Sequence, residues 1–453
     1  MKKPGYSTED NLHCSALEDA LIFEEIGEIT MKRMLLFAVS CIFIIAACNT
    51  NDQTTSQMYV KVIDGQGNGI ENATVVVGNQ AGEVASFLST DDVGEAYFHV
   101  APSNATVTAA FSCYAPSTNR TYYYVNIAYD VNVSAVTLTL GTCDQITQRV
   151  NINVTDKVEG ITYSEVTLGP ITYSGSSVTM DVYDLQDDGN ISVFASGYDD
   201  AGNIKGYGFA LDQPAVDGSV IEVAIDRTDL NQNTHIFGNV PLNAVSYYAF
   251  VALLRKHAVT NLPFNFIWGM APLPASMTTY STGGFADNNM FGATVSVDQD
   301  SDGNADADIG LIRYLHDVSD QFFDFSLAPL VPGNLTFNPG AARRPIISWS
   351  NNDSGSTMQK LSLDYSSTSP QRISFNYTMT VPASAEGLVF PELPDTLAAF
   401  RPETYSNLSL ETVKFDGPTK YDDYLEAIAN YNGRFYEEGA LSSYNYSRIS
   451  RLP

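Results

Sequence analysis

Basic residues, histidine and tryptophan are scarce in this chain of 453 residues. It has 23 lysines and arginines against 52 aspartates and glutamates, so the net charge is −29 at pH 7. A chain of this charge repels nucleic acid, which is therefore excluded as a partner, and it also repels anionic lipid head groups. The charge favours cation binding, and an acidic surface suited to a salty habitat is the alternative explanation.

Catalytic signatures are missing as well. The five histidines, with His235, His257 and His316 among them, form no H-E-x-x-H pattern, so zinc hydrolysis lacks its ligands. The sequence contains no G-x-S-x-G elbow and no phosphate-binding glycine loop. Glycoside hydrolysis needs only two carboxylates, so a carbohydrate-active hydrolase stays open as an alternative. The sequence otherwise predicts a protein that is not an enzyme.

A long apolar run stands near the start of the chain. Residues 34–47 follow Lys32 and Arg33, are interrupted only by Ser40, and end in small residues before Cys48. This is the organisation of a secretory signal peptide, and the run is shorter than the roughly 20 residues of a membrane span. A buried helix or an uncleaved signal anchor is the alternative.

Residues 45–48, Ile-Ala-Ala-Cys, resemble the lipobox of bacterial lipoproteins. The resemblance implies cleavage just before Cys48 and acylation of this cysteine on its sulfur and its new amino group. Several acyl chains would hold the mature protein firmly on a membrane. Asn49, in place of aspartate, implies sorting to the outer membrane. Because a signal peptide acts from the amino terminus, we expect Met31 to be the true start.

Strand and turn residues dominate the rest of the chain. Tyrosine and phenylalanine number 26 and 23, and glycine, serine, threonine and asparagine recur throughout. One stripe has helical spacing and predicts a helix over residues 422–430: Tyr421, Tyr424, Leu425, Ile428 and Tyr431. We therefore predict an all-β protein of tandem immunoglobulin-like or fibronectin-like antiparallel β-sandwiches with one short C-terminal helix.

The first part of the body has about seven short alternating segments between residues 58 and 143. Turn clusters at residues 64–69 and 89–94 separate them. The pattern resembles the carboxypeptidase-regulatory-like and related bacterial immunoglobulin-like modules at these positions: Val60, Val62, Asp64, Gly67, Ile70, Ala73, Val75, Thr90, Asp91, Gly94, Ala96 and Phe98. The resemblance implies a β-sandwich and no activity, since the family takes its name from an accessory domain.

Three cysteines follow residue 47. With Cys48 lipidated, Cys113 and Cys143 remain as one pair, and an oxidising compartment favours a disulfide between them. Two free buried thiols are the alternative.

Further turn clusters divide the rest of the body. In its last part, Trp349 and Tyr405 resemble the arrangement of a fibronectin type III domain, which is an analogy of fold alone. The expected divisions are a spurious extension (1–30), a signal peptide (31–47), a lipidated tether (48–57), the first sandwich (58–143), a second sandwich (148–235), a β-rich region with an acidic loop (236–331) and a fibronectin-like domain with the helix (332–453).

That acidic loop is the motif with the clearest chemistry. Carboxylates occupy nearly every second position, and Gly303 stands at the sixth. Calcium takes about six to eight oxygen ligands, and alternate spacing lets a looping chain turn several toward one centre. The stretch resembles the calcium loops of EF-hand, dockerin and thrombospondin type 3 repeats. It predicts a structural calcium ion with these ligands: Asp298, Asp300, Asp302, Asn304, Asp306 and Asp308.

The loop departs from an EF-hand in two respects. Its twelfth position is Ile309 rather than glutamate, and the flanks at 291–297 and 309–315 have the pattern of strands. We therefore expect a loop between two strands that binds calcium more weakly than an EF-hand sensor. A solvated acidic turn without an ion is the alternative.

These features together predict an outer-membrane lipoprotein with a binding, adhesive or architectural role. The expected partners are the membrane, through the N-terminal lipid, and a glycan or protein ligand. Whether the body faces the cell surface or the periplasm stays open. A periplasmic partner in envelope assembly is the alternative function, and a carbohydrate-active hydrolase is a more distant one.

Overall fold

The computed structural model describes residues 57–451, with gaps at 66, 101–102, 117, 144–145, 170, 184–188, 256–257, 283, 287, 316–320, 340–343, 352, 354, 368–371, 402–404 and 431–442. The predicted extension, the signal peptide and all but the last residue of the tether lie outside the described residues. Residues 56–453 form one compact unit, and its fold is described below.

The unit is all-β with one short C-terminal helix, as the sequence predicts. This helix, α3 (Tyr421–Asn430), begins one residue before the predicted range and has two aspartates in its first turn, where they favour the helix dipole. Two short 3₁₀ turns are η2 (Phe325–Leu327) and η3 (Asp395–Phe400). Within the described residues, no helix is long and apolar enough to cross a membrane.

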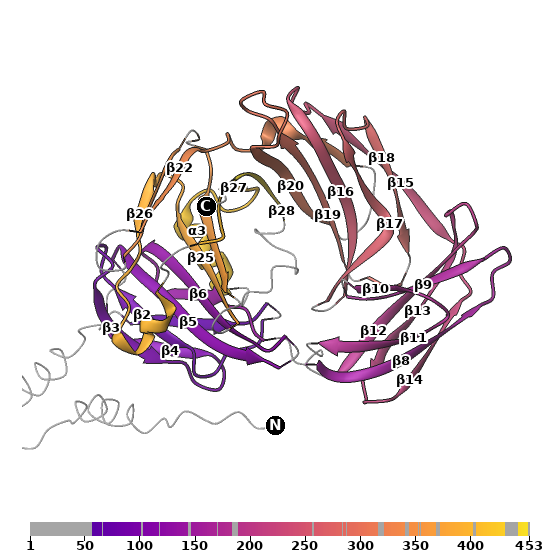
Figure 1. Cartoon of the computed structure of the whole chain (residues 1–453), viewed down its shortest axis with the longest axis horizontal. Helices are drawn as coiled ribbons and strands as arrows, with labels where there is room; N and C mark the ends of the chain where they lie inside the picture. Colours follow the sequence, from indigo (N-terminus) through magenta and orange to yellow (C-terminus); the bar gives the residue numbers. More distant parts are fainter. Residues whose placement is uncertain are drawn as a thin grey trace, which may run out of the picture. The chain divides into compact units, whose positions relative to one another are not determined.

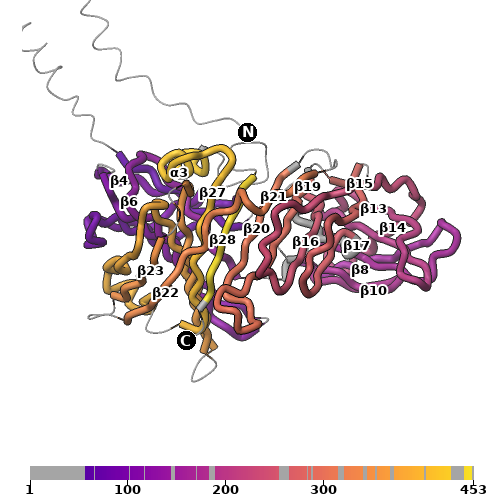
Figure 2. The backbone as a smooth tube through the Cα atoms, turned by 90° about the horizontal axis from the view of Figure 1, so that it is seen from above, coloured from indigo at the N-terminus to yellow at the C-terminus, as the bar shows by residue number. Residues whose placement is uncertain are grey.

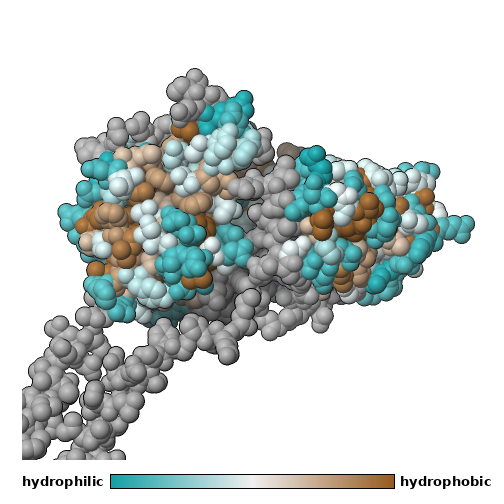
Figure 3. All heavy atoms as spheres, turned by 90° about the horizontal axis from the view of Figure 1, so that it is seen from below, coloured by the Kyte–Doolittle hydropathy of each residue, from teal (hydrophilic) through white to brown (hydrophobic). Residues whose placement is uncertain are grey.

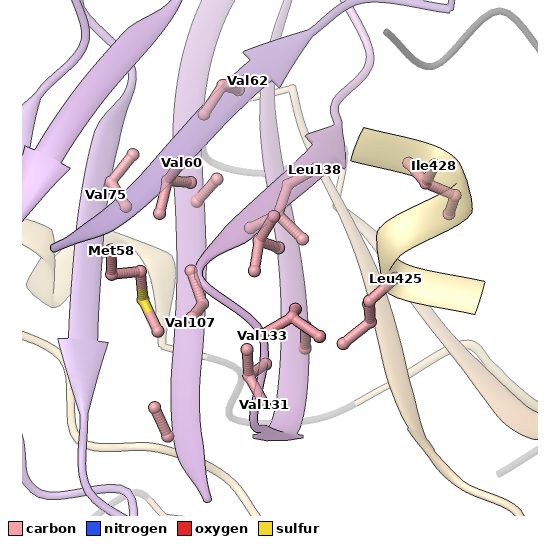
Figure 4. Close-up of a cluster of buried hydrophobic side chains, with 14 of the residues drawn as sticks. Met58, Val60, Val62, Val75, Val107, Val131, Val133, Leu138, Leu425 and Ile428 are labelled. Carbon is pink, nitrogen blue, oxygen red and sulfur yellow. The ribbon is translucent and has the colours of Figure 1, made fainter. Parts of the chain in front are cut away.

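The first sandwich is formed by strands between Met58 and Thr139. One layer has the order β4-β1-β7, with bounds Glu95–Phe98, Met58–Ile63 and Ala135–Thr139. The facing strands are β3 (Val84–Ser89), β2 (Thr74–Gly78), β5 (Ala105–Ala115) and β6 (Arg120–Val131). Every second residue of β1 points inward, and Figure 4 shows Met58, Val60 and Val62 among the core side chains of both layers and α3.

Thr90 explains part of the motif that resembles the regulatory-like modules. Its hydroxyl accepts a hydrogen bond from the Ala73 N–H at 2.9 Å and donates one to the Ile70 carbonyl at 2.6 Å, within the buried core. The turn that follows needs Gly94, because its φ is +81° and a Cβ there would lie 2.3 Å from the Val62 carbonyl oxygen. These two motif positions therefore serve the fold.

Replacing Thr90 with valine is expected to lower the free energy of unfolding by about 2 kcal/mol, since each buried polar group left unpaired costs about 1–3 kcal/mol. Urea denaturation measures the loss. Thr74→Val is the matched control, because the Thr74 hydroxyl makes no hydrogen bond with a described residue. A loss at Thr90 no larger than at Thr74 contradicts this account of the motif.

Cys113 and Cys143 form a disulfide in the structure. Cys113 lies on β5, and Cys143 follows β7 on the way out of the sandwich. The bond joins the two layers of the sandwich near the point where the chain leaves it.

The two sheets of the second sandwich contain only strands β8 to β14. One sheet has the order β10-β9-β12-β13, with bounds Ile171–Ser174, Tyr163–Leu168, Asn190–Tyr198 and Ile204–Pro214. The other has the order β11-β8-β14, with bounds Ser177–Tyr183, Ile146–Asp156 and Val220–Ile225. Val150, Ile152, Val193 and Val223 are buried between the two sheets.

A twelve-stranded sheet joins the other three predicted regions. Its order is β17-β16-β19-β20-β28-β27-β24-β25-β6-β5-β2-β3 (Figure 1). The strands not yet introduced are β16 (Ala244–Arg255), β17 (Ala258–Met270), β19 (Asn288–Val297), β20 (Ala307–Leu315), β24 (Met358–Ser367), β25 (Ile373–Pro382), β27 (Asn407–Phe415) and β28 (Ser443–Arg451). β6 pairs with β25 in parallel, and β28 lies between β27 and β20. The boundaries expected at residues 143 and 331 therefore do not separate the sheets.

Two three-stranded sheets cover one face of this large sheet. The first has the order β18-β15-β21, with bounds Ser276–Thr282, Leu230–Gly238 and Gln321–Asp324. The second has the order β22-β23-β26, with bounds Gly333–Asn338, Ile346–Ser350 and Gly387–Val389. Trp349 of β23 is buried between the second sheet and the large sheet and donates a hydrogen bond to Gln359, whereas Tyr405 packs on Phe337.

The opposite face of the large sheet receives α3 and β7. Leu425 and Ile428 of α3 lie beside Leu138 of β7 in the same core cluster (Figure 4). Figure 2 shows α3 beside β27, a strand of the large sheet. On the face of the molecule seen in Figure 3, apolar and polar residues are interspersed.

Candidate functional site

The acidic loop joins β19 to β20, as the strand-like flanks predict. The Asp298 N–H donates to the Asn243 carbonyl at 3.0 Å, and the Asp306 N–H donates to the Val297 carbonyl at 2.9 Å. These bonds fix both ends of the loop on the large sheet. Two positive φ angles, +66° at Ser301 and +90° at Gly303, provide the sharp bend.

Three of the six predicted ligands converge. Carboxylate oxygens of Asp298, Asp300 and Asp306 all lie within 4.8 Å of one another. The Asp298 carboxylate is held by the N–H groups of Ser301 and Gly303, at 2.6 and 2.7 Å. Two oxygens bound to one calcium at about 2.4 Å lie at most about 4.8 Å apart, so the three carboxylates fit a common ion.

Two of the other predicted ligands, Asp302 and Asp308, lie outside this group. The Asp302 carboxylate accepts hydrogen bonds from the backbone N–H and the side-chain amide of Asn304, at 2.8 and 3.0 Å. These bonds lower the pKa of the Asp302 carboxyl, because they stabilise its charged form. Asp308 belongs to β20 and accepts a hydrogen bond from the Ser296 hydroxyl at 2.8 Å.

Cys48, His257 and His316 lie outside the described residues. His235 is fully buried, and its Nε2 lies 2.6 Å from the Thr279 hydroxyl oxygen. Its ring packs against Phe291, with centroids 4.7 Å apart. This histidine is therefore part of a hydrophobic core.

A pocket lies between α3, β7 and the face of the large sheet. Its volume is about 370 Å³, within the usual range for small-ligand sites. The following residues line it: Asn126, Thr137, Leu138, Thr139, Tyr314, Met358, Lys360, Thr378, Thr380, Glu411, Val413, Phe415, Tyr424, Leu425, Ile428 and Tyr444. They come from seven strands and the helix, so no single stretch of sequence contains the pocket.

Two buried polar atoms in the lining residues lack a hydrogen-bond partner within the described part of the chain. The Asn126 amide nitrogen donates to the Thr139 carbonyl at 2.9 Å, which leaves its Oδ1 as an unpaired acceptor. The Thr137 hydroxyl is unpaired as well. The two residues are 9% and 4% exposed. Because buried polar atoms are nearly always paired, each of these two atoms needs a partner that the described residues do not supply, such as water or a ligand.

A row of four charged residues crosses neighbouring strands beside the pocket. In register across the sheet, Lys360 of β24 faces Glu411 of β27, Glu411 faces Arg448 of β28, and Arg448 faces Asp308 of β20. Arg448 donates to Glu411 through its Nε at 2.9 Å and also through Nη2. Lys360 forms no ion pair with a described residue, so it is the unpaired end of the row.

Aromatic rings form another wall of the pocket. Phe415 stacks on Tyr424 with centroids 5.2 Å apart and lies 5.4 Å from the Tyr444 ring. Burial raises the pKa of both tyrosine hydroxyls, and the Glu411 carboxylate raises it further. Both phenols therefore stay protonated at neutral pH and can act as hydrogen-bond donors.

Sequence reasoning missed this pocket. The tyrosine stripe predicted the helix alone, whereas Tyr424 packs in the core and also lines the pocket. The alternating charges of Lys360, Glu411, Arg448 and Asp308 become a signal once the strand register is known. Because the positions are so far apart in sequence, no local pattern could reveal them.

No protein-family model matches the chain, and no curated protein matches it. Solved structures are similar to parts of it. The TIE protein of Bacillus anthracis shares 8% identity with a TM-score of 0.17, over 59% of this chain and 49% of that one. A DUF4876 family protein from Bacteroides thetaiotaomicron shares 13% identity with a TM-score of 0.14, over 46% and 45%.

A leucine-rich repeat protein from Bacteroides thetaiotaomicron shares 9% identity with a TM-score of 0.16, over 39% of this chain and 25% of that one. The matched part thus spans about half or less of each of these structures. At such low TM-scores the likenesses carry no argument about function, which must come from the chain's own residues.

Proposed function

We propose that this protein is a lipid-anchored bacterial envelope protein whose body binds a ligand and performs no catalysis. The observation that carries the binding role is the pocket beneath α3, with Asn126 Oδ1 and the Thr137 hydroxyl buried and unpaired among the described residues. The anchor rests on the apolar run that ends at Cys48. The proposed location is the outer membrane, because Asn49 follows this cysteine.

The charges of the pocket support binding over hydrolysis. Glu411 is the one carboxylate among the residues that line it, and Arg448 neutralises that group. Glycoside hydrolysis needs two carboxylates on either side of the scissile bond. The pocket therefore lacks the second group that a hydrolase of this kind requires.

Thermal shift of the full-length protein tests the binding role. A panel of neutral, acidic and amino monosaccharides and disaccharides is the probe, and at least one member is expected to raise the melting temperature. Thr378→Tyr fills the pocket and is expected to abolish that rise. If no sugar shifts the wild-type protein, or if Thr378→Tyr responds as the wild type does, the proposed function is wrong.

We also propose that the acidic loop binds a structural calcium ion. The three convergent carboxylates of Asp298, Asp300 and Asp306 support this, since without a cation they repel one another. About 10 mM calcium is roughly 10 to 100 times the dissociation constant of an extracellular-type site. It is therefore expected to raise the free energy of unfolding by about 1.4–2.7 kcal/mol.

Thermal melting with calcium and with chelator measures this gain. Asp298→Asn is expected to lose it, whereas Asp302→Asn is the matched control and is expected to keep it, because Asp302 lies outside the convergent group. Identical melting curves with and without calcium, together with no heat of binding in calorimetry, would show that the loop binds no calcium.

An envelope-assembly partner is the second candidate, and one observation favours it. On the outermost strand pair of the large sheet, Trp268 and Met270 are 73% and 74% exposed, and Trp268 lies opposite Tyr248. Exposed apolar side chains grouped in this way are common where proteins meet. Under this alternative, Trp268→Asp would disturb envelope assembly and leave sugar binding unchanged.

A further inference from the structure

We infer that the pocket beneath α3 takes an acidic sugar, a compound that combines one carboxylate with several hydroxyl groups. The inference rests on the binding role proposed above and names the class of ligand for that pocket. Three features of the lining residues carry it: an unpaired cation, unpaired buried polar atoms and an aromatic wall.

Lys360 supplies the charge that selects an acid. It is the one lysine or arginine among the residues that line the pocket, and it has no ion pair within the described residues. Glu411, which faces it across the strands, is already bonded to Arg448. As the unpaired cation among the lining residues, Lys360 is complementary to a carboxylate, which it can bind by a charge-assisted hydrogen bond.

The polar atoms select hydroxyl groups on that acid. Asn126 Oδ1 can only accept a hydrogen bond, whereas the Thr137 hydroxyl can accept or donate one. Thr139 and Thr378 line the same pocket. A fatty acid would offer a carboxylate to Lys360 but no donor to Asn126. A hydroxylated acid provides both.

The aromatic wall and the volume suit a sugar ring. Phe415, Tyr424 and Tyr444 line the pocket and give it an apolar wall against which a sugar ring can pack. A volume of about 370 Å³ suits one ring with its substituents better than a long chain.

Isothermal titration calorimetry of the full-length protein tests the inference, with D-glucuronate as the probe and D-glucose as its neutral counterpart. The wild type is expected to bind glucuronate at least tenfold more tightly than glucose, since a charged hydrogen bond distinguishes them. Lys360→Gln is expected to weaken glucuronate binding by about ten- to a hundredfold, and Lys360→Arg to restore most of it. Lys414→Gln is the control, because it removes an exposed lysine of β27 that does not line the pocket.

The outcomes separate the ligand class from the binding role. Equal affinity for glucose and glucuronate, or a Lys360→Gln protein that binds glucuronate as the wild type does, shows that the ligand is not an acidic sugar. The binding role of the pocket is unaffected by either result. An absence of binding by every sugar tested overturns the pocket itself. Tighter binding of an oligosaccharide that ends in glucuronate identifies a polysaccharide end as the source, and equal binding identifies the free sugar.

Discussion

Deletion of residues 443–453 is expected to abolish the cooperative unfolding transition of the body. These residues contain β28, which forms ladders with β20 on one side and with β27 on the other. Its removal leaves the facing backbone groups of two inner strands unpaired, and each buried unpaired group costs about 1–3 kcal/mol. The summed loss exceeds the roughly 5–15 kcal/mol by which a domain is normally stable.

The side chains of β28 add to this loss. The Tyr446 hydroxyl oxygen lies 2.7 Å from that of Thr294, and the fully buried Ser447 donates to the Leu330 carbonyl at 3.1 Å. Circular dichroism during heating measures the transition. Deletion of residues 452–453 alone, which leaves β28 whole, is the control and should melt as the full chain does. A sharp, native-like transition in the longer deletion contradicts the twelve-stranded sheet.

Replacement of Cys113 and Cys143 by serine is expected to lower the free energy of unfolding by about 3–4 kcal/mol, from the entropy of a loop of this length. The two cysteines are 30 residues apart in sequence and join β5 to the exit of the first sandwich. Without the bond, the unfolded chain gains conformations that the folded chain does not. Urea denaturation of the double variant measures the change.

Reduction of the wild-type protein by a thiol is the matched experiment. It should reproduce the loss of the double variant, and the same reductant should leave the variant unchanged. A double variant within about 0.5 kcal/mol of the wild type would show that the bridge contributes no more than an ordinary surface contact.

Local elements of this fold could be predicted, because alternation and turn residues determine them. The strand at residues 58–63 and the helix at 422–430 are examples, since their apolar spacing is clear. β28 was missed because its buried side chains include Asn445 and Ser447, which do not look like a core pattern. Its burial comes from the two strands beside it, and these lie far away in the sequence.

Long-range pairing also limited the prediction of domains. The first sandwich was expected to end near residue 143, yet its strand β6 continues into a parallel ladder with β25. No local pattern encodes this ladder, because β6 ends at Val131 and β25 begins only at Ile373. The second sandwich was expected to reach residue 235, yet β15 pairs with β18 and β21, and β14, the last strand of the sandwich, ends at Ile225.

In the acidic loop as well, the local sequence pattern predicted some side-chain positions, and strand pairing determined others. Alternate spacing predicted six ligands, and the turn brings Asp298, Asp300 and Asp306 together. Asp308 instead follows the period of β20, which starts at Ala307, and so points across the sheet toward Ser296. Strand geometry thus overrode the loop pattern at this position.

Mass spectrometry of the mature amino terminus tests the central claim most directly, namely that a lipid anchor holds a binding body on the bacterial envelope. The protein is expressed in a bacterium from the full sequence and purified from the membrane fraction. The account predicts an N-terminal peptide that begins at Cys48 and carries the added mass of several acyl chains. A peptide that begins elsewhere, or an unmodified Cys48 in a protein that is still membrane-bound, would contradict it.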